Sequence, residues 1–228
     1  MRTTFFKYQG TGNDFIIIDN RHDIFDKNDT KQIENLCDRR FGIGADGLIL
    51  LEKDDTHDFR MRYYNADGNE STMCGNGGRC IVKFAQHIGI IENKTSFMAI
   101  DGEHEATIHD ELVSLQMQDV YEINKYDNYV FLDTGSPHHV EMTNNLKELD
   151  IKDLGSKIRH GYPYNKVGSN VNFVSQDSDD TFSVRTYERG VEDETLSCGT
   201  GVTAVALAMN FIGKSSSNLI HLKTSGGI

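Results

Sequence analysis

Short apolar segments separated by polar turns dominate the chain, and their periodicity predicts strands more often than helices. Residues 15–19 and 48–51 are runs of bulky apolar residues, which are typical of buried strands. Residues 59–64 alternate between apolar and polar side chains, as a strand with one buried face does. Residues 65–68 (NADG) then predict a turn, because Asn, Asp and Gly tolerate a positive φ.

Two segments have helical patterns instead. The first begins near Thr30, where Ile33, Leu36 and Cys37 recur at the spacing that places them on one helix face. The second is the run at 202–209, which follows a Cys-Gly-x-Gly motif and is apolar on nearly every side. A helix without a polar face is expected to be buried all round. We therefore predict an amphipathic helix in the first half of the chain and a central helix after the Cys-Gly-x-Gly motif of each half.

The second half of the chain repeats the first half at an offset of 123 residues, which becomes 124 just before the second cysteine motif. The matched segments are residues 11–13 with 134–136, 48–51 with 171–174, 59–64 with 182–187, 74–77 with 198–201, and 88–89 with 212–213. One short match arises by chance, but five matches in the same order indicate an ancestral duplication.

This repeat predicts an α+β fold with two pseudo-symmetric halves. Each half is expected to be a curved, mostly antiparallel sheet or barrel wrapped around a central helix. We place the first half at residues 1–118, with Cys74, and the second half at residues 119–228, with Cys198. Residues 105–132 have no counterpart in the second copy, so we expect that half to lack its last strands. The chain is then either a truncated fragment or a protein whose second barrel is open at one edge.

Composition and charge narrow the class of protein. The 23 Lys and Arg against 35 Asp and Glu give a net charge of −12, which argues against a nucleic-acid partner, because such proteins need a basic surface. The same charge disfavours a membrane surface, and no apolar run reaches the roughly 18 residues of a membrane span. The N-terminus lacks a signal-peptide pattern, and 4 Cys make no disulfide scaffold, so we expect a cytoplasmic protein.

The four cysteines are of two kinds. Cys37 and Cys80 lie at helical spacing among apolar neighbours, so we interpret them as small buried hydrophobic residues. Cys74 and Cys198 each precede Gly-x-Gly and a predicted helix, at matching positions of the two copies. The N–H groups and dipole of a helix N-terminus stabilise an anion, which lowers the pKa of a thiol there and lets the amides bind a carboxylate. In a pseudo-two-fold structure we expect these two helix ends to face each other.

This arrangement favours proton transfer over metal binding or redox chemistry. Cys74 and Cys80 are further apart than a usual zinc-binding pair, and no second pair accompanies them, so no metal is expected. The chain also lacks a C-x-x-C motif. Two thiols on opposite sides of one carbon can remove a proton from one face and deliver a proton to the other. That is the chemistry of a racemase or epimerase.

Several motifs closely resemble those of the diaminopimelate epimerase family, and together they cover nearly the whole chain. The matching segments are residues 10–15 (GTGNDF), 40–47 (RFGIGADG), 64–68 (YNADG), 74–80 (CGNGGRC), 187–190 (YERG) and 197–201 (SCGTG). Proline racemase-like and phenazine-biosynthesis isomerases share the architecture but not this full set of motifs.

The resemblance implies the epimerisation of LL-2,6-diaminopimelate to meso-diaminopimelate, in lysine and peptidoglycan-precursor biosynthesis. It implies a mechanism with one thiolate and one thiol, no cofactor such as pyridoxal phosphate, and no metal. It also implies a homodimer whose small-molecule partner is the substrate.

Carried onto this chain, the family motifs imply roles for individual residues. Cys74 and Cys198 resemble the catalytic acid–base pair. The residues that resemble substrate-binding groups are Asn13, Asn65, Gly75, Asn76, Asn170, Glu188, Arg189, Gly199 and Thr200. Four of these directly follow the cysteines and would hold the carboxylate of the reacting centre through their amides. His138 and Glu188 would adjust the pKa values of the two cysteines.

Two positions depart from the commoner family pattern. Ser136 stands where Asn is usual, and Gly47 stands where some members have a substrate-contacting Gln. Ser can still donate one hydrogen bond, but Gly offers no side chain. The early C-terminus is a third departure, which bears on stability more than on chemistry.

Other interpretations of the same residues stay open. Asn65 lies in a turn, where Asn is common for backbone reasons alone, and Glu188 and Arg189 could form a solvated surface pair. Cys74 and Cys198 could form a reversible disulfide in a redox protein, or the chain could be an inactive module that binds diaminopimelate. Turnover of a chiral amino acid under reducing conditions would support the epimerase alone.

Overall fold

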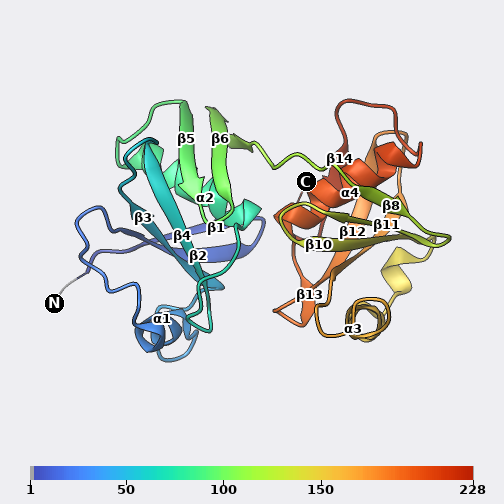
Figure 1. Cartoon of the computed structure of the whole chain (residues 1–228), viewed down its shortest axis with the longest axis horizontal. Coiled ribbons are helices and arrows are strands. Elements are labelled where there is room, and N and C mark those ends of the chain that lie inside the picture. Colours follow the sequence, from blue (N-terminus) through green and yellow to red (C-terminus); the bar gives the residue numbers. More distant parts are fainter. Residues whose placement is uncertain (1–2, 228) are drawn as a thin grey trace. The chain divides into compact units, whose positions relative to one another are not determined.

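Figure 1 shows the computed structural model, which describes residues 3–227 of the chain. The chain divides into two compact units between Gln116 and Met117, and each unit is built on a seven-stranded sheet. Both units share a series of two strands, a helix, two strands, the Cys-Gly-x-Gly helix and a further strand. The second unit has an additional strand before this series and a short one just before its Cys-Gly-x-Gly helix, and the first unit has two additional strands after the series. The repeat in the sequence is therefore also a repeat in the structure.

The first unit contains the strands and the amphipathic helix that the sequence predicts. Its elements are β1 (Phe6–Gly10), β2 (Asn13–Asp19), α1 (Thr30–Cys37), β3 (Gly47–Glu52), β4 (Phe59–Asn65), α2 (Gly75–His87), β5 (Lys94–Ala99), β6 (Gly102–His109) and β7 (Leu112–Leu115). The strands are hydrogen-bonded in chain order. Pairing is parallel between β2 and β3 and between β4 and β5, and antiparallel elsewhere.

The sheet of the first unit curls around α2, as expected. β1 and β7 are the two ends of the strand order, and both contact this helix. Ile81, Phe84 and Ala85 of α2 are completely buried in the cluster that fills the inner face. The central helix is therefore the core of this unit.

β2 and β3 are covered on both faces, which explains why their sequences do not alternate. Ile17 and Ile49 belong to the cluster around α2. Ile16 and Leu48 point to the other face and pack with Ile33 of α1. A strand with two covered faces needs apolar residues at every position.

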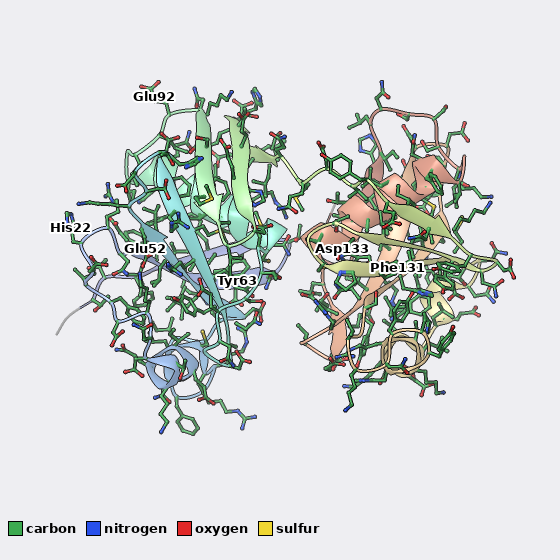
Figure 2. The ribbon with its side chains drawn as sticks, in the orientation of Figure 1. His22, Glu52, Tyr63, Glu92, Phe131 and Asp133 are labelled. Carbon is green, nitrogen blue, oxygen red and sulfur yellow. The ribbon has the colours of Figure 1, made fainter. Side chains whose placement is uncertain are left out.

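The second unit repeats the middle of this arrangement with different edges. Its elements are β8 (Ile123–Lys125), β9 (Tyr129–Asp133), β10 (Pro137–Met142), the 3-10 helix η1 (Leu146–Glu148), α3 (Ile151–His160), β11 (Asn170–Gln176), β12 (Thr181–Glu188), β13 (Asp193–Thr195), α4 (Gly199–Phe211) and β14 (His221–Lys223). The strand order is β13-β12-β11-β10-β9-β8, and Phe131 and Asp133 mark β9 in Figure 2. β14 pairs parallel with β12, as β5 does with β4.

The expectation that the second central helix is buried all round is wrong. Val202 and Ala206 of α4 are only half-buried, whereas their counterparts Gly78 and Val82 in α2 are buried. In the first unit Leu115 of β7 lies close to Gly78 and covers this side of the helix. Within the described part of the second unit no strand follows β14, so the corresponding side of α4 remains accessible to solvent.

The amphipathic helix α3 is the counterpart of α1, and the sequence did not predict it. Its N-cap is Asp150, whose side chain accepts a hydrogen bond from the backbone nitrogen of Asp153 at 3.0 Å. Gly155 interrupts the helical pattern, because Gly has a low helix propensity. The structure requires Gly there, since a Cβ would lie 2.3 Å from the Cβ of Tyr187 on β12.

Candidate active site

Cys74 and Cys198 occupy the same place in their units. Each is the N-cap of the central helix, α2 in the first unit and α4 in the second. Their backbone conformations are nearly equal, with φ −108° and ψ 118° at Cys74 and φ −115° and ψ 115° at Cys198. Both thiols are therefore carried by the first turn of a helix, where the backbone N–H groups favour negative charge.

In the first unit, Asn13 at the start of β2 lies beside Cys74. Sγ of Cys74 is 3.6 Å from Oδ1 of Asn13, and Nδ2 of Asn76 donates to the same oxygen at 3.3 Å. Oδ1 of Asn76 in turn accepts a hydrogen bond from Arg79 at 2.5 Å. The structure thus brings three of the predicted site residues into contact.

Asp46, which no pattern in the sequence singled out, holds Asn13 in place. Nδ2 of Asn13 donates to Oδ2 of Asp46 at 2.7 Å. Arg39 joins this carboxylate to that of Asp14, with 2.7 Å to an oxygen of each. Although burial opposes ionisation, hydrogen bonds from Arg39 and a neighbouring lysine hold the pKa of Asp14 well below its usual range. The available signal was one Asp among small residues in the segment 44–47 (GADG).

An aromatic ring fills the space beside Gly47. A Cβ at this position would lie 2.5 Å from the backbone oxygen of Tyr64 and 2.6 Å from Cε2 of Tyr63. Tyr63, labelled in Figure 2, also packs edge-on against Phe15, with 5.8 Å between the ring centroids. Packing of β3 on β4 therefore requires Gly here, and this position contributes no side chain to a substrate.

In the second unit, a buried network joins Cys198 to His138. Oγ1 of Thr200 lies 3.4 Å from Sγ of Cys198 and 3.0 Å from Nε2 of His138. Ser136 Oγ lies 3.0 Å from the same nitrogen and 3.2 Å from the Thr200 hydroxyl. Desolvation, together with the charge of Arg189, lowers the pKa of His138 to about 3, so its imidazole is neutral. His138 is therefore two hydrogen bonds away from the Cys198 sulfur.

Asn172 fixes the other side of His138, and it too was missed. Its Nδ2 lies 3.1 Å from Nδ1 of His138 and donates to the backbone oxygen of His139 at 3.0 Å. Its Oδ1 accepts a hydrogen bond from the Thr186 hydroxyl at 3.0 Å. The signal in the sequence was a polar residue within the otherwise apolar segment 171–174, because a buried Asn needs partners for its amide.

Asn170 connects Arg189 to the same network. Its Nδ2 donates to Oγ of Ser136 at 3.2 Å and to the backbone oxygen of Pro137 at 3.1 Å. Its Oδ1 accepts a hydrogen bond from the backbone nitrogen of Arg189 at 2.9 Å. The guanidinium of Arg189 donates to the backbone oxygen of Val167 at 3.2 Å. The chain around Arg189 is thus positioned by a buried amide.

Asn65 and Glu188 are repeat-mates, and each is the last residue of its strand, β4 or β12. Both are half-buried. The backbone oxygen of Asn65 accepts from the nitrogen of Gly68 at 3.0 Å, and that of Glu188 accepts from Glu192 at 2.8 Å. Both residues therefore begin a turn that leads towards the cysteine of their unit.

The other two cysteines lie in apolar surroundings. Cys37 belongs to the cluster between α1 and the first sheet, and Cys80 belongs to the cluster around α2. Burial raises the pKa of Cys37 to about 11, and burial with the nearby Cys74 raises that of Cys80 to about 12. Thiols with such pKa values stay protonated near neutral pH.

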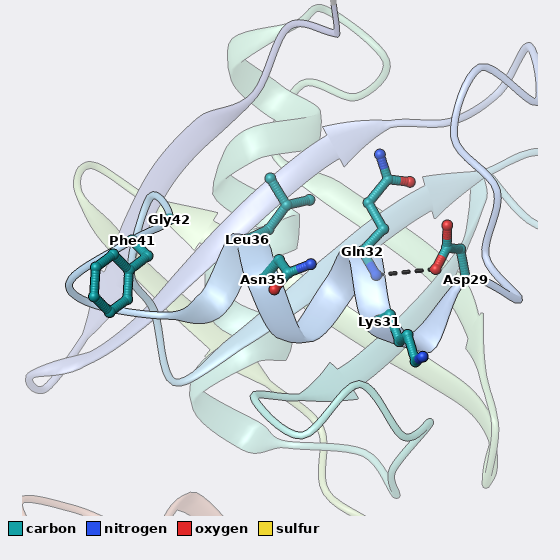
Figure 3. Close-up of a pocket in the computed structure, with 7 residues that line it drawn as sticks. All are labelled: Asp29, Lys31, Gln32, Asn35, Leu36, Phe41 and Gly42. Carbon is teal, nitrogen blue, oxygen red and sulfur yellow. Dashed lines mark hydrogen bonds between the residues drawn. The ribbon is translucent and has the colours of Figure 1, made fainter.

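A shallow pocket beside α1 contains none of the predicted site residues (Figure 3). Its lining residues are Asp29, Lys31, Gln32, Asn35, Leu36, Phe41 and Gly42. The Asp29 side chain is the N-cap of α1 and accepts a hydrogen bond from the backbone nitrogen of Gln32 at 3.0 Å. The carboxylate of Asp29 in this pocket therefore caps the start of the helix.

The described residues also bear on metal and membrane binding. Within residues 3–227, no three or more His, Cys, Asp and Glu side chains are grouped as a metal site would require. In the same part of the chain, no helix combines the length and the apolar character needed to cross a membrane.

Known proteins resemble this chain in both sequence and fold. The model of the family described as diaminopimelate epimerase matches residues 5–122 and 130–228. The diaminopimelate epimerase of Flavobacterium psychrophilum is 63% identical over 223 residues, which are 97% of this chain and 87% of that protein. The diaminopimelate epimerase of Chlorobaculum tepidum is 48% identical over 227 residues, which are 96% of this chain and 88% of that protein.

Among solved structures, a phenazine biosynthesis protein of the PhzF family from Bacillus anthracis has the same fold. The TM-score is 0.72 at 13% identity, and the match covers 92% of this chain and 81% of that one. At this identity the likeness bears on the fold alone.

Proposed function

This chain belongs to the diaminopimelate epimerase family, and from that premise we propose that Cys74 and Cys198 are its two catalytic bases. The protein is an isomerase, and its activity is the epimerisation of diaminopimelate. One cysteine, as a thiolate, removes the α-proton of LL-2,6-diaminopimelate. The other, as a thiol, delivers a proton to the opposite face and gives the meso product. The reaction belongs to lysine and peptidoglycan-precursor biosynthesis.

The observation that carries this proposal is the repetition of one thiol site in the two units. Cys74 and Cys198 have the same helix N-cap position and nearly the same backbone conformation. An epimerisation is reversible, so the group that accepts a proton in one direction must donate it in the other. The same residue type in two equivalent sites meets that requirement, because a thiol and a thiolate exchange roles in each turnover.

The amides that follow the cysteines are assigned to the carboxylate of the reacting centre. They belong to Gly75, Asn76, Gly199 and Thr200. The first N–H groups of an α-helix have no partner within the helix, and their dipoles favour an anion. Their placement beside each thiol supports this assignment, because the carboxylate is bonded to the α-carbon that loses the proton.

The remaining predicted residues are assigned to the ammonium groups and the distal end of the substrate. They are Asn13, Asn65, Asn170, Glu188 and Arg189. The planar guanidinium of Arg189 suits a carboxylate, which it can bind with two parallel hydrogen bonds. We assign His138 and Glu188 to the adjustment of the cysteine pKa values; the link from His138 through Thr200 to Cys198 supports the first of these assignments.

The proposed reaction requires no cofactor and no metal, because side chains of this chain carry out both proton transfers. The resemblance of the motifs supports a homodimer in the cytoplasm. The net charge of −12 supports a small-molecule substrate rather than a nucleic acid or an anionic membrane as partner.

Turnover of LL-diaminopimelate in heavy water tests the two-base mechanism. Deuterium should appear at the inverted α-carbon of the meso product, while the remaining LL substrate carries much less label early in the reaction. The abstracting thiol holds hydrogen that comes from the substrate, and the donating thiol holds solvent deuterium. Cys37→Ala, a change within the apolar cluster between α1 and the first sheet, is the matched control and should keep this labelling pattern.

Equal early labelling of substrate and product would contradict two bases and indicate a single one. No turnover of LL-diaminopimelate by reduced protein would contradict the epimerase activity itself.

A further inference from the structure

The two cysteines differ in the groups that contact their sulfur atoms. The helix N-termini do not cause this difference, because Cys74 and Cys198 have the same N-cap geometry. The polarity of the neighbouring hydrogen bonds does, and it can be followed atom by atom within each unit. The inference that follows rests on the proposed two-base function.

In the first unit, Cys74 faces a hydrogen-bond acceptor. The carboxylate of Asp46 can only accept, so the nitrogen of Asn13 points to Asp46 and its oxygen points to Cys74. The same oxygen accepts from the nitrogen of Asn76, whose own oxygen is turned towards Arg79. A carboxylate and a guanidinium therefore fix the orientation of both amides.

This acceptor suits a thiol and opposes a thiolate. The S–H of Cys74 can donate to Oδ1 of Asn13 at 3.6 Å, whereas a thiolate would face the negative end of the amide dipole. The ion pairs of Arg39 with Asp46 and Asp14 hold the acceptor in this position. The contacts of the first unit thus favour the protonated form.

In the second unit, the position of one buried proton can be fixed. Asn172 must turn its nitrogen towards the backbone oxygen of His139 and its oxygen towards the Thr186 hydroxyl. The same nitrogen donates to Nδ1 of His138, so that ring nitrogen is an acceptor. His138 is neutral, because burial and the charge of Arg189 lower its pKa to about 3. Its single N–H is therefore at Nε2.

The proton on Nε2 sets the direction of the next hydrogen bonds. Nε2–H of His138 faces the hydroxyl oxygens of Thr200 and Ser136 at 3.0 Å each. Ser136 also accepts from Asn170, so its own proton is directed to Oγ1 of Thr200 at 3.2 Å. With its oxygen accepting, Thr200 directs its hydroxyl proton to Sγ of Cys198 at 3.4 Å. A hydrogen-bond donor at the sulfur favours the thiolate.

We propose that the resting enzyme carries the exchangeable proton on Cys74 and the negative charge on Cys198. The Cys198 thiolate then removes the α-proton of whichever stereoisomer presents it to the second unit. The electron pair of the broken C–H bond stays on the α-carbon and forms a new C–H bond with the proton of Cys74. Afterwards Cys198 is the thiol and Cys74 the thiolate, the form from which the reverse reaction begins.

The charged groups beside the Cys74 network are of both signs, because Arg39 pairs with Asp14 and Asp46 and Arg79 donates to Asn76. Cys80 is a further titratable neighbour of Cys74. In the second unit the Arg189 guanidinium lies near His138 and favours negative charge, and Glu188 is the last residue of β12. The polarity of the hydrogen bonds therefore carries the assignment, and the sum of the charges does not.

The pH dependence of alkylation at each cysteine tests this assignment. Reduced wild-type protein is treated with iodoacetamide over a range of pH values, and initial rates are measured for each cysteine peptide by mass spectrometry. The midpoint of each profile reports ionisation independently of how accessible the sulfur is. We expect the Cys198 midpoint to lie at least about one pH unit below that of Cys74, because a hydrogen bond to a charged group is worth about one pKa unit or more. Cys37 and Cys80 serve as internal references with high midpoints.

Three variants separate the contributions of the two networks. Thr200→Val removes the donor without changing the shape of the side chain and should raise the Cys198 midpoint by about one unit. Thr200→Ser keeps the hydroxyl and should restore the wild-type value. Asp46→Asn removes the charge that orients Asn13, so it should lower the Cys74 midpoint and leave that of Cys198 in place.

A Cys74 midpoint equal to or below that of Cys198 in the wild-type protein would overturn the proposal. So would a Thr200→Val variant whose two midpoints are unchanged or shift together. These outcomes are distinct from a failure of the epimerase function, because the alkylation profiles need no turnover. Solvent deuterium in the meso product is scored separately, and its absence contradicts the catalytic roles whatever the midpoints are.

Discussion

The central helices of the two units differ in the size of a buried residue that each presents to its core. Phe84 of α2 is completely buried and packs against Phe6, with 4.9 Å between ring centroids. Its repeat-mate in α4 is Ala208, which is also completely buried. The cores have diverged while both helices still begin after a cysteine in nearly the same conformation. Packing volume is therefore free to vary in this fold as long as the start of the helix is kept.

The polar contacts of the two cysteines have diverged as well. Asn13 contacts Cys74 and accepts a hydrogen bond from Asn76, whereas their repeat-mates Ser136 and Thr200 belong to the network that reaches Cys198. Two identical sites would give both thiols the same intrinsic pKa, so a single proton would be shared equally between them. Unlike neighbours instead assign that proton to one of the two cysteines, which strict symmetry would not do.

Loss of either cysteine should give the largest effect on activity. Cys74→Ala and Cys198→Ala should each lower the epimerisation rate by at least roughly 10²-fold, as expected when a positioned acid or base is removed. The double variant should be little worse than either single one, because the two act as one unit. Initial rates of meso-diaminopimelate formation measure these losses.

The same variants sharpen the comparison between the units. Cys74→Ala keeps the thiolate of Cys198, so it should still exchange the α-hydrogen of one stereoisomer with solvent deuterium without inversion. Cys198→Ala keeps only the sulfur that faces an acceptor, and its exchange should be slower. Substantial epimerase activity in the Cys198→Ala protein would contradict the two-thiol mechanism. It would also contradict the inference that the repeated motif marks two equivalent catalytic sites.

Exchanging the core residues of the two units should show that their packing is no longer equivalent. Phe84→Ala should lower the free energy of unfolding of the first unit by about 3–5 kcal/mol, because it leaves a cavity beside α2. Ala208→Phe inserts a further ring into the cluster around α4, which already contains Phe182, and should cost about 1–3 kcal/mol. Urea titration combined with amide hydrogen exchange resolves the two units. If Ala208→Phe caused no loss of stability, the conclusion that the two helices are packed differently at this position would be wrong.

The elements that the sequence predicts are those whose signal is local. The runs at 15–19 and 48–51, and the motif that opens each central helix, needed no knowledge of tertiary contacts. α3 was missed because Gly155 weakens its local pattern, and only the contact with Tyr187 explains that glycine. The burial of α4 was overestimated, because an apolar sequence does not show which strands cover a helix.

The residues of the candidate site also fall into those that a local sequence signal reveals and those that depend on tertiary contacts. Cys74 and Cys198 could be found because a motif is repeated, and the motif itself implies a helix N-terminus. Asp46 and Asn172 act through side chains that are distant in sequence, and the pairing of β2 with β3 and of β10 with β11 brings these together. No local pattern contains that register, so these two positions became visible only in the structure.

Arg189 should matter for substrate binding, and its repeat-mate should not, because that residue is Ala66. Arg189→Ala should lower kcat/KM. The loss should correspond to an increase of about 2–4 kcal/mol in the activation free energy, in the range for removing a charged partner of a substrate. Arg189→Lys should not restore activity, since an ammonium cannot form the paired hydrogen bonds of a guanidinium. Steady-state kinetics with LL-diaminopimelate test both variants, and near wild-type values would make Arg189 a surface charge only.

The smallest expected effect concerns pH, and it should appear in the first unit alone. Burial by itself would lower the pKa of His104, but the hydrogen bond to Asp101 at 3.0 Å and the charge of that carboxylate raise it above its usual value of 6.5. A raised folded-state pKa means that His104 stabilises the unit fully below the unfolded-state pKa, and that this contribution is lost as the pH rises through the folded-state value. The stability of β6, measured by hydrogen exchange, should therefore fall as the pH rises above about 6.5, and His104→Gln should abolish that fall. In the second unit His138 is neutral in the folded chain, and above that pH it is also largely neutral in the unfolded chain, so β10 should show no matching decline. Parallel declines in β6 and β10 would mean that the two units respond to pH as one, and that the His104–Asp101 pair is not the cause.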